Sequence, residues 1–254
     1  MGTSSIYNGK NDYNPLLPED YDEPQVNSDD KSKVKWKTVK TDMSKFIRSG
    51  GQKGSVSHIT KQYIKASGGS SKMLSQSTSG VATGIRIGTF FNSVITNGLV
   101  VTFRNLGIEF SGRKIEEVFS KLINVLAPDS NSKEDIVAKE AAEEALSKIY
   151  DYVEKNKMEL ECLEKMPIDL MNEALCEYVS SYIWVLIMND LESRFEKYID
   201  DAKQTLALEK EFKDYISSVV KTEFNSKGDI INQDVNSSIS DLYMKCFEVL
   251  EGTL

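Results

Sequence analysis

The segment between Pro167 and Ile199 places the strongest constraint on how this chain folds. Around Trp184 and Val185 it is apolar in every direction that a helix presents. Its apolar residues recur every three or four positions, the spacing that gathers them on a helix; they are Met171, Leu175, Tyr178, Val179, Tyr182, Ile183, Leu186, Ile187, Leu191, Phe195 and Tyr198. We therefore expect a central helix over 170–199 that other helices enclose.

Helical periodicity continues through most of the chain beyond Ser55. It predicts further helices over 55–66, 71–105, 112–126, from Ser132 onward, 204–224 and 235–251. No sustained apolar–polar alternation between 55 and 254 requires a sheet, and no repeat has a solenoid period. The predicted fold class is all-α: a multi-helix domain over 53–254, preceded by a flexible tail over 1–52.

Three glycines interrupt the helix predicted over 71–105. Gly80, Gly84 and Gly88 fall every fourth residue, so they form one smooth stripe along a helix. Such a stripe lets another backbone approach closely, and each glycine lowers intrinsic helix stability by roughly 1 kcal/mol relative to alanine. We therefore expect this helix to depend on packing against its neighbours.

The first 50 residues are polar and hold three of the five prolines, Pro15, Pro18 and Pro24. They contain too little apolar surface to offset the entropy of ordering, which predicts a flexible tail. Tyr13, Leu16, Leu17 and Tyr21 form a small apolar island around two of the prolines. An island of this kind suits an extended segment that docks into a partner's groove, although an ordinary linker has the same composition.

A lysine-rich segment follows the apolar island. Residues 31–53 contain eight Lys or Arg against Asp42 alone, a local charge of +7 that leaves -15 on the remaining residues. In extended form, Lys33, Lys35 and Lys37 would share one face and Trp36 the other. This asymmetry predicts contact with nucleic acid or an acidic partner; the alternative is a solvated linker lying on the protein's own acidic domain.

Charge and cysteine content restrict the functional class. A net charge of -8 argues against a surface built throughout for nucleic acid or anionic lipid. Three cysteines without a CxxC pair suit free thiols in a reducing compartment, so the cytoplasm is the expected location. We expect no signal peptide and no membrane span, because the longest apolar run covers only 182–188.

The sequence offers little catalytic chemistry. His58 is the only histidine, and no nucleophile is placed beside it by any motif. The glycine clusters at 50–55 and 68–72 do not fit a phosphate-loop pattern, and the cysteine spacings match no zinc site. We therefore expect a binding or adaptor protein without metal or cofactor rather than an enzyme; a hydrolase of unknown type is the weaker alternative.

Two features together carry a family resemblance. They are the start Met1-Gly2-Thr3-Ser4-Ser5 with Pro15-Leu16-Leu17-Pro18 behind it, and a helical domain that contains Gly80-Val81-Ala82-Thr83-Gly84. The chain resembles the QatB family, the second component of the bacterial four-gene Qat anti-phage system. That system also encodes a P-loop ATPase, an enzyme resembling the 7-cyano-7-deazaguanine synthase QueC, and a TatD-like nuclease.

The resemblance implies that the tail is presented to the QueC-like enzyme. In related systems such enzymes join a deazaguanine base to an N-terminal glycine, which here would be Gly2 after removal of Met1. The resemblance thus implies modification at Gly2 and partner contacts at Gly2, Thr3, Ser4, Pro15, Leu16, Leu17 and Pro18. The alternative function is a helical adaptor that binds nucleic acid through 31–53.

Overall fold

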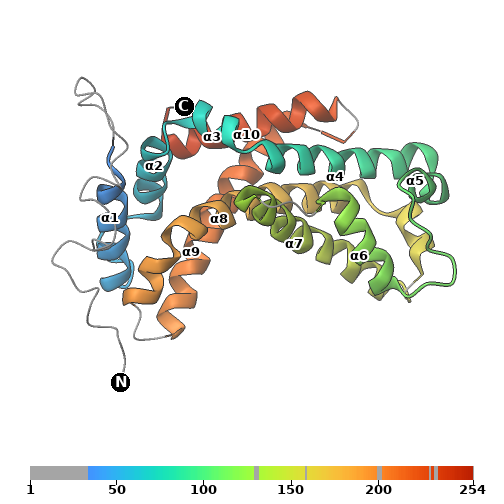
Figure 1. Ribbon diagram of the computed structural model, residues 1–254, viewed down its shortest axis with the longest axis horizontal. Coiled ribbons are helices and arrows are strands. Elements are labelled where there is room, and N and C mark those ends of the chain that lie inside the picture. Colours follow the sequence, from blue (N-terminus) through green and yellow to red (C-terminus); the bar gives the residue numbers. More distant parts are fainter. Residues whose placement is uncertain are drawn as a thin grey trace. The chain divides into compact units, whose positions relative to one another are not determined.

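The computed structural model describes residues 34–128, 132–157, 159–198, 202–228, 230–231 and 234–253. The chain divides into two units, 1–33 and Val34–Leu254, and every element described belongs to the second. Those residues form ten α-helices and one 3₁₀ helix (Figure 1): α1 Trp36–Arg48, α2 Val56–Ala66, α3 Ser70–Gln76, α4 Thr78–Asn97, α5 Leu99–Asn105, α6 Ile115–Leu126, α7 Lys133–Lys155, η1 Leu160–Lys165, α8 Ile168–Tyr198, α9 Ala202–Lys227 and α10 Val235–Glu251. The predicted all-α class is confirmed.

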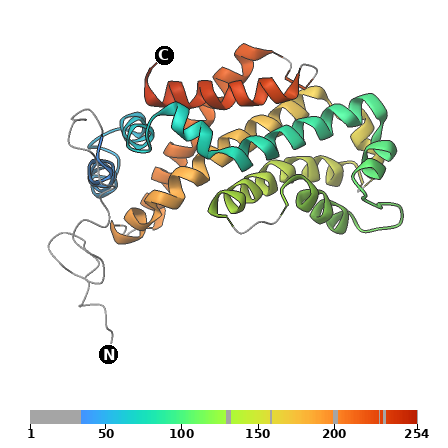
Figure 2. The same ribbon diagram turned by 45° about the horizontal axis from the view of Figure 1, so that its top comes forward.

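Helix α8 is the element around which the others pack. It contacts α7, α9, α1 and α4, and both views show it crossing between them (Figures 1 and 2). Tyr182 and Ile183 have no exposed surface, and the Trp184 ring packs 6.2 Å from that of Phe212 on α9. The enclosure expected from the apolar pattern around Trp184 is thus present.

The segment predicted as one helix over 71–105 is three helices, so that prediction is wrong. The chain breaks at Ser77, between α3 and α4, and at Gly98, between α4 and α5. Gly98 has φ +79°, a conformation that favours glycine and that ends a right-handed helix. The periodicity of the apolar residues survives both breaks, which is why the sequence pattern did not reveal them.

Glutamates that are distant in the sequence accept hydrogen bonds from the backbone N–H groups that these breaks leave without a partner inside the helix. The first turn of a helix has N–H groups without partners inside the helix, and none of α3, α4 and α5 has a side-chain cap from its own N-cap residue. Ser70 N donates to Glu251 at 2.9 Å, and Leu99 N donates to Glu164 at 3.2 Å. Glu134 performs the same role for α4. The negative charge of each carboxylate also interacts favourably with the positive end of the helix dipole.

The glycine stripe of α4 receives side chains rather than a second backbone. A Cβ on Gly80 would overlap the ring of Tyr182, and one on Gly88 would lie 2.7 Å from a methyl carbon of Val235. The Tyr178 hydroxyl also donates to the Gly80 carbonyl at 2.8 Å. The expectation of close packing holds, but the close approach is made by α8 tyrosines and by Val235 of α10.

The compact unit begins before residue 53, where the sequence predicted the start of the helical domain, because it includes α1. Val39, Met43, Phe46 and Ile47 are buried, and α1 packs on α2 and α8. The Phe46 ring meets the Phe212 ring edge-on at 5.7 Å. Residues 36–48 are therefore part of the compact unit, because they form a helix whose apolar face is large enough to pack on α2 and α8 although lysines surround it in the sequence.

Candidate functional site

The residues predicted to meet the QueC-like partner are Gly2, Thr3, Ser4, Pro15, Leu16, Leu17 and Pro18, and all lie outside the described residues, as does Lys33. The structure therefore leaves those predictions as they stand. Of the predicted site residues it places Lys35, Trp36 and Lys37, at the start of α1.

The extended alternation predicted for this segment is wrong from Trp36 onward, because these residues are helical. Lys35 and Lys37 remain exposed, but Trp36 packs against Tyr63 of α2, with ring centroids 5.3 Å apart. The Tyr63 hydroxyl donates to Asp190 of α8 at 2.9 Å, and Asp190 also pairs with Lys133 of α7 at 2.6 Å. Trp36 thus helps to anchor α1.

Burial, followed by the charge of Asp190 and the hydrogen bond to it, raises the pKa of Tyr63 well above 10. The phenol therefore stays protonated and keeps donating.

His58, the only histidine, lies beside α1 rather than in a cavity. Its Nε2 is 3.4 Å from Asp42, which also pairs with Lys45 at 3.3 Å. His58 is half exposed and lies in the first turn of α2, where its backbone N–H donates to the side chain of the N-cap Ser55. The geometry makes His58 part of a polar cluster on the surface. Within the part of the chain that the structure describes, no three His, Cys, Asp or Glu side chains are grouped to hold a metal ion.

A hollow of about 210 Å³ opens at the start of α4. Its lining comes from α4, the end of α6 and the start of α7: Thr78, Ser79, Ala82, Thr83, Arg86, Ala127, Pro128, Asp135 and Ala138. Arg86 is directed to the end of α6, where it donates to the Leu126 carbonyl at 3.3 Å.

Glu134, near the start of α7, hydrogen-bonds to both α4 and α8. It accepts from Ser79 N at 2.7 Å, Gly80 N at 3.1 Å and the Tyr182 hydroxyl at 3.1 Å. With Thr78 as a fourth donor, this carboxylate joins α7 to both α4 and α8. Sequence analysis did not single out Glu134, because its partners are 48 to 56 residues away along the chain.

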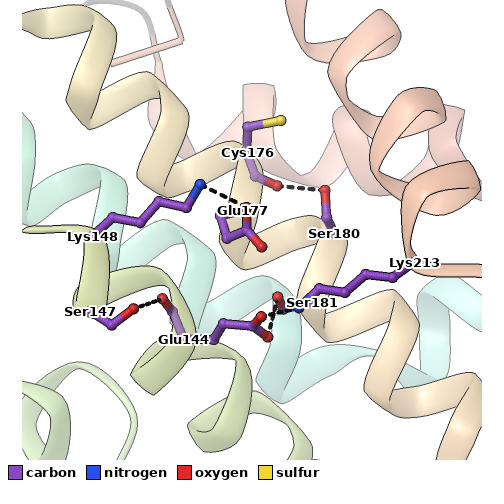
Figure 3. Close-up of polar contacts among 8 residues, drawn as sticks. All are labelled: Glu144, Ser147, Lys148, Cys176, Glu177, Ser180, Ser181 and Lys213. Atoms are coloured by element: carbon purple, nitrogen blue, oxygen red, sulfur yellow. Dashed lines mark hydrogen bonds and ion pairs between the residues drawn. The ribbon is translucent and has the colours of Figure 1, made fainter. Parts of the chain in front are cut away.

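A second polar cluster joins α7, α8 and α9 (Figure 3). Glu144 of α7 accepts from Ser181 of α8 at 2.7 Å and pairs with Lys213 of α9. One turn along α7, Lys148 pairs with Glu177 of α8 at 3.0 Å. The Glu144 carboxylate thus contacts two neighbouring helices.

The pKa shifts of Glu144 and Cys176 are consistent with a role of this cluster in helix packing. Burial alone would raise the pKa of Glu144, but hydrogen bonds from Lys213 and Ser181, with the charges of Lys213 and Lys148, lower it. Nearby, burial and then the charge of Glu177 raise the pKa of Cys176 to about 11. Near pH 7 Glu144 is therefore ionised and is a weak base. Cys176 is a neutral thiol at this pH and is therefore a weak nucleophile.

No helix within the described residues is long and apolar enough to cross a membrane. Comparison with curated proteins and comparison with solved structures both return no match. Residues 68–250 match a family described as "Qat anti-phage system associated protein QatB". The match runs from just before α3 to the end of α10, and so takes in Glu134, Glu144 and the glycine stripe, while α1 and α2 precede it. Because the match covers well over half of its length, this chain belongs to the QatB family of Qat anti-phage system proteins.

Proposed function

We propose that this protein is a non-enzymatic subunit of the Qat system, acting in the cytoplasm, whose N-terminal tail is bound by the QueC-like enzyme and receives a deazaguanine at Gly2. The family match carries the proposal, because it assigns the chain to an anti-phage system. The start Met1-Gly2-Thr3 adds a chemically suitable acceptor, because Gly2 lies 32 residues ahead of Val34, where the helical unit begins.

The chemistry favours the α-amine of Gly2 over the tail lysines. An α-amino group has a pKa of about 8 and a lysine one of about 10.4, so more of the α-amine is neutral near pH 7. The neutral amine attacks the carbonyl carbon of an activated deazaguanine carboxylate. An N–C bond forms, the activating group leaves with the C–O electron pair, and the surplus amine proton passes to solvent. Glycine presents this amine without a side chain.

Mass spectrometry of the protein expressed with and without the QueC-like enzyme tests the modification. We expect one added mass, on the N-terminal peptide that begins at Gly2. Gly2→Pro should abolish it, while Lys10→Arg, which removes the nearest lysine amine, should leave it intact. An addition confined to lysine, or an unmodified protein that still protects cells against phage, would contradict the proposal.

Binding of the tail is tested separately from its modification. Leu16→Asp with Leu17→Asp should reduce co-purification with the QueC-like enzyme, because the apolar island supplies the contact. Glu19→Gln, close by in the same segment, is the matched control and should co-purify normally. Unchanged co-purification of the double variant would remove the island from the interface. The P-loop ATPase and the TatD-like nuclease are further proposed partners, and the same purification reports on them.

A second candidate function is an adaptor that binds nucleic acid through 31–53. The exposure of Lys35 and Lys37 favours it, since neither forms an ion pair with a described residue. Trp36 does not support it, because its ring is packed on Tyr63.

A further inference from the structure

Helix α1 has an outer face that is turned away from the helices on which α1 packs. Its inner face is buried on α2 and α8. On the opposite side four exposed residues recur at intervals of four, four and three: Lys37, Thr41, Lys45 and Arg48. At 1.5 Å per residue this row, here called the α1 cationic row, extends over roughly 16 Å.

In and around α1, Lys and Arg residues outnumber Asp and Glu residues. Residues 34–72 contain nine Lys or Arg and a single carboxylate, Asp42, whereas 73–254 contain 19 Lys or Arg and 31 Asp or Glu. Asp42 is shared between Lys45 and His58. Lys35, Lys37, Lys40 and Lys53 pair with no described carboxylate, so the described acidic surface does not neutralise them.

The row lacks what a protein partner would need at the centre of an interface. Stable protein interfaces are anchored by apolar or aromatic side chains. The exposed large hydrophobic residues of the described chain lie elsewhere, at Ile95, Val100, Val101, Val125, Ile136, Ile168 and Leu206. The two aromatic residues of α1, Trp36 and Phe46, pack on Tyr63 and Phe212. Lys and Arg side chains and hydroxyl donors contact phosphate backbones, and the row has both kinds of group.

We infer that the α1 cationic row binds the phosphate backbone of nucleic acid without reading its sequence. This deepens the second candidate function and does not depend on the chemistry at Gly2. It replaces the predicted set Lys33, Lys35, Trp36 and Lys37 with a row on the helix surface. The acidic remainder of the unit repels phosphate, which confines the contact to this side of α1.

Fluorescence anisotropy of the full-length protein with labelled 20-base-pair DNA, between 50 and 200 mM salt, tests this inference. Three phosphate contacts predict a slope of about -2.7 in log affinity against log salt, or a roughly 40-fold loss over this range. Changing Lys37, Lys45 and Arg48 together to Gln should abolish that salt-dependent binding. Changing the exposed Lys121, Lys155 and Lys245 to Gln removes the same charge from the rest of the chain and should preserve the slope.

Each other result overturns the inference. If the wild-type protein shows no salt-dependent binding, nucleic-acid binding itself fails; if the α1 variant binds as the wild type does, only the α1 row fails. Equal losses in both triple variants would indicate a net-charge effect. Polyglutamate competing as well as unlabelled DNA would indicate an acidic protein partner. Circular dichroism melting of the α1 variant checks that it remains folded at the temperature of the binding measurement.

Discussion

Gly80 shows how closely one residue couples α4 to α8. The Tyr182 ring occupies the space of a β-carbon at this position, and the Gly80 carbonyl accepts from Tyr178. Gly80→Ala should therefore lower the free energy of unfolding by about 1–3 kcal/mol, because overpacking outweighs the gain in helix propensity. Urea titration measures the change. Thr89→Ala, at an exposed position of the same helix, should be neutral or slightly stabilising; a stabilised Gly80→Ala would show that Tyr182 moves freely.

Glu144 makes stability depend on pH. Because its pKa is lowered in the folded protein, its contribution is present above the ordinary value of 4.5 and is lost as pH falls through the folded value. The melting-temperature difference between wild type and Glu144→Gln should be largest near pH 7 and should shrink below pH 4.5. Glu143→Gln, at the exposed neighbouring position, should differ little from wild type throughout. A difference that grew on acidification would contradict the sign assigned here.

At the scale of the element, α8 distinguishes two positions that the sequence pattern treats alike. Ile183 is fully buried, whereas Leu186 is half-buried. Ile183→Asp should cost several kcal/mol of unfolding free energy, since its carboxylate has no described partner in the core. Leu186→Asp should cost clearly less, because its carboxylate can reach water. Chemical denaturation compares the two with Glu143→Gln as control, and equal losses would show that α8 is not oriented as described.

At the scale of the whole molecule, α1 decides where the compact unit begins. Trypsin should cut after Lys40 and Lys45 no faster than after Lys210 of α9, since Phe46 fixes α1 against Phe212. Phe46→Ala should expose the α1 sites, with a loss of about 3–5 kcal/mol. Timed digestion with mass spectrometry measures both. A fragment starting near residue 53 that melts at the wild-type temperature would restore the boundary expected from composition.

The sequence predicted what periodicity encodes and missed what depends on contacts between distant residues. The central helix, the all-α class and the helix predicted from Ser132 onward follow from local patterns, and the structure has all three. The sequence did not predict α1, because its apolar face consists of only a few residues that alternate with lysines in the sequence. The break at Ser77 was obscured because Glu134, which satisfies the new α4 amides, lies 54 and 55 residues away from them. The tail residues predicted as the partner site lie outside the described part of the chain.

The origin of the helix caps sets an order of events during folding. Ser55, Ser132 and Asp234 cap α2, α7 and α10 from the residue just before each helix, so those helices can begin to form in the unfolded chain. Helices α3, α4 and α5 gain their carboxylate partners only when α10, α7 and η1 have docked. An isolated peptide of residues 132–155 should accordingly show more helix than one of residues 77–97. The glycine-rich helix α4, near the start of the family match, would then form late in folding, on neighbouring helices that have already assembled.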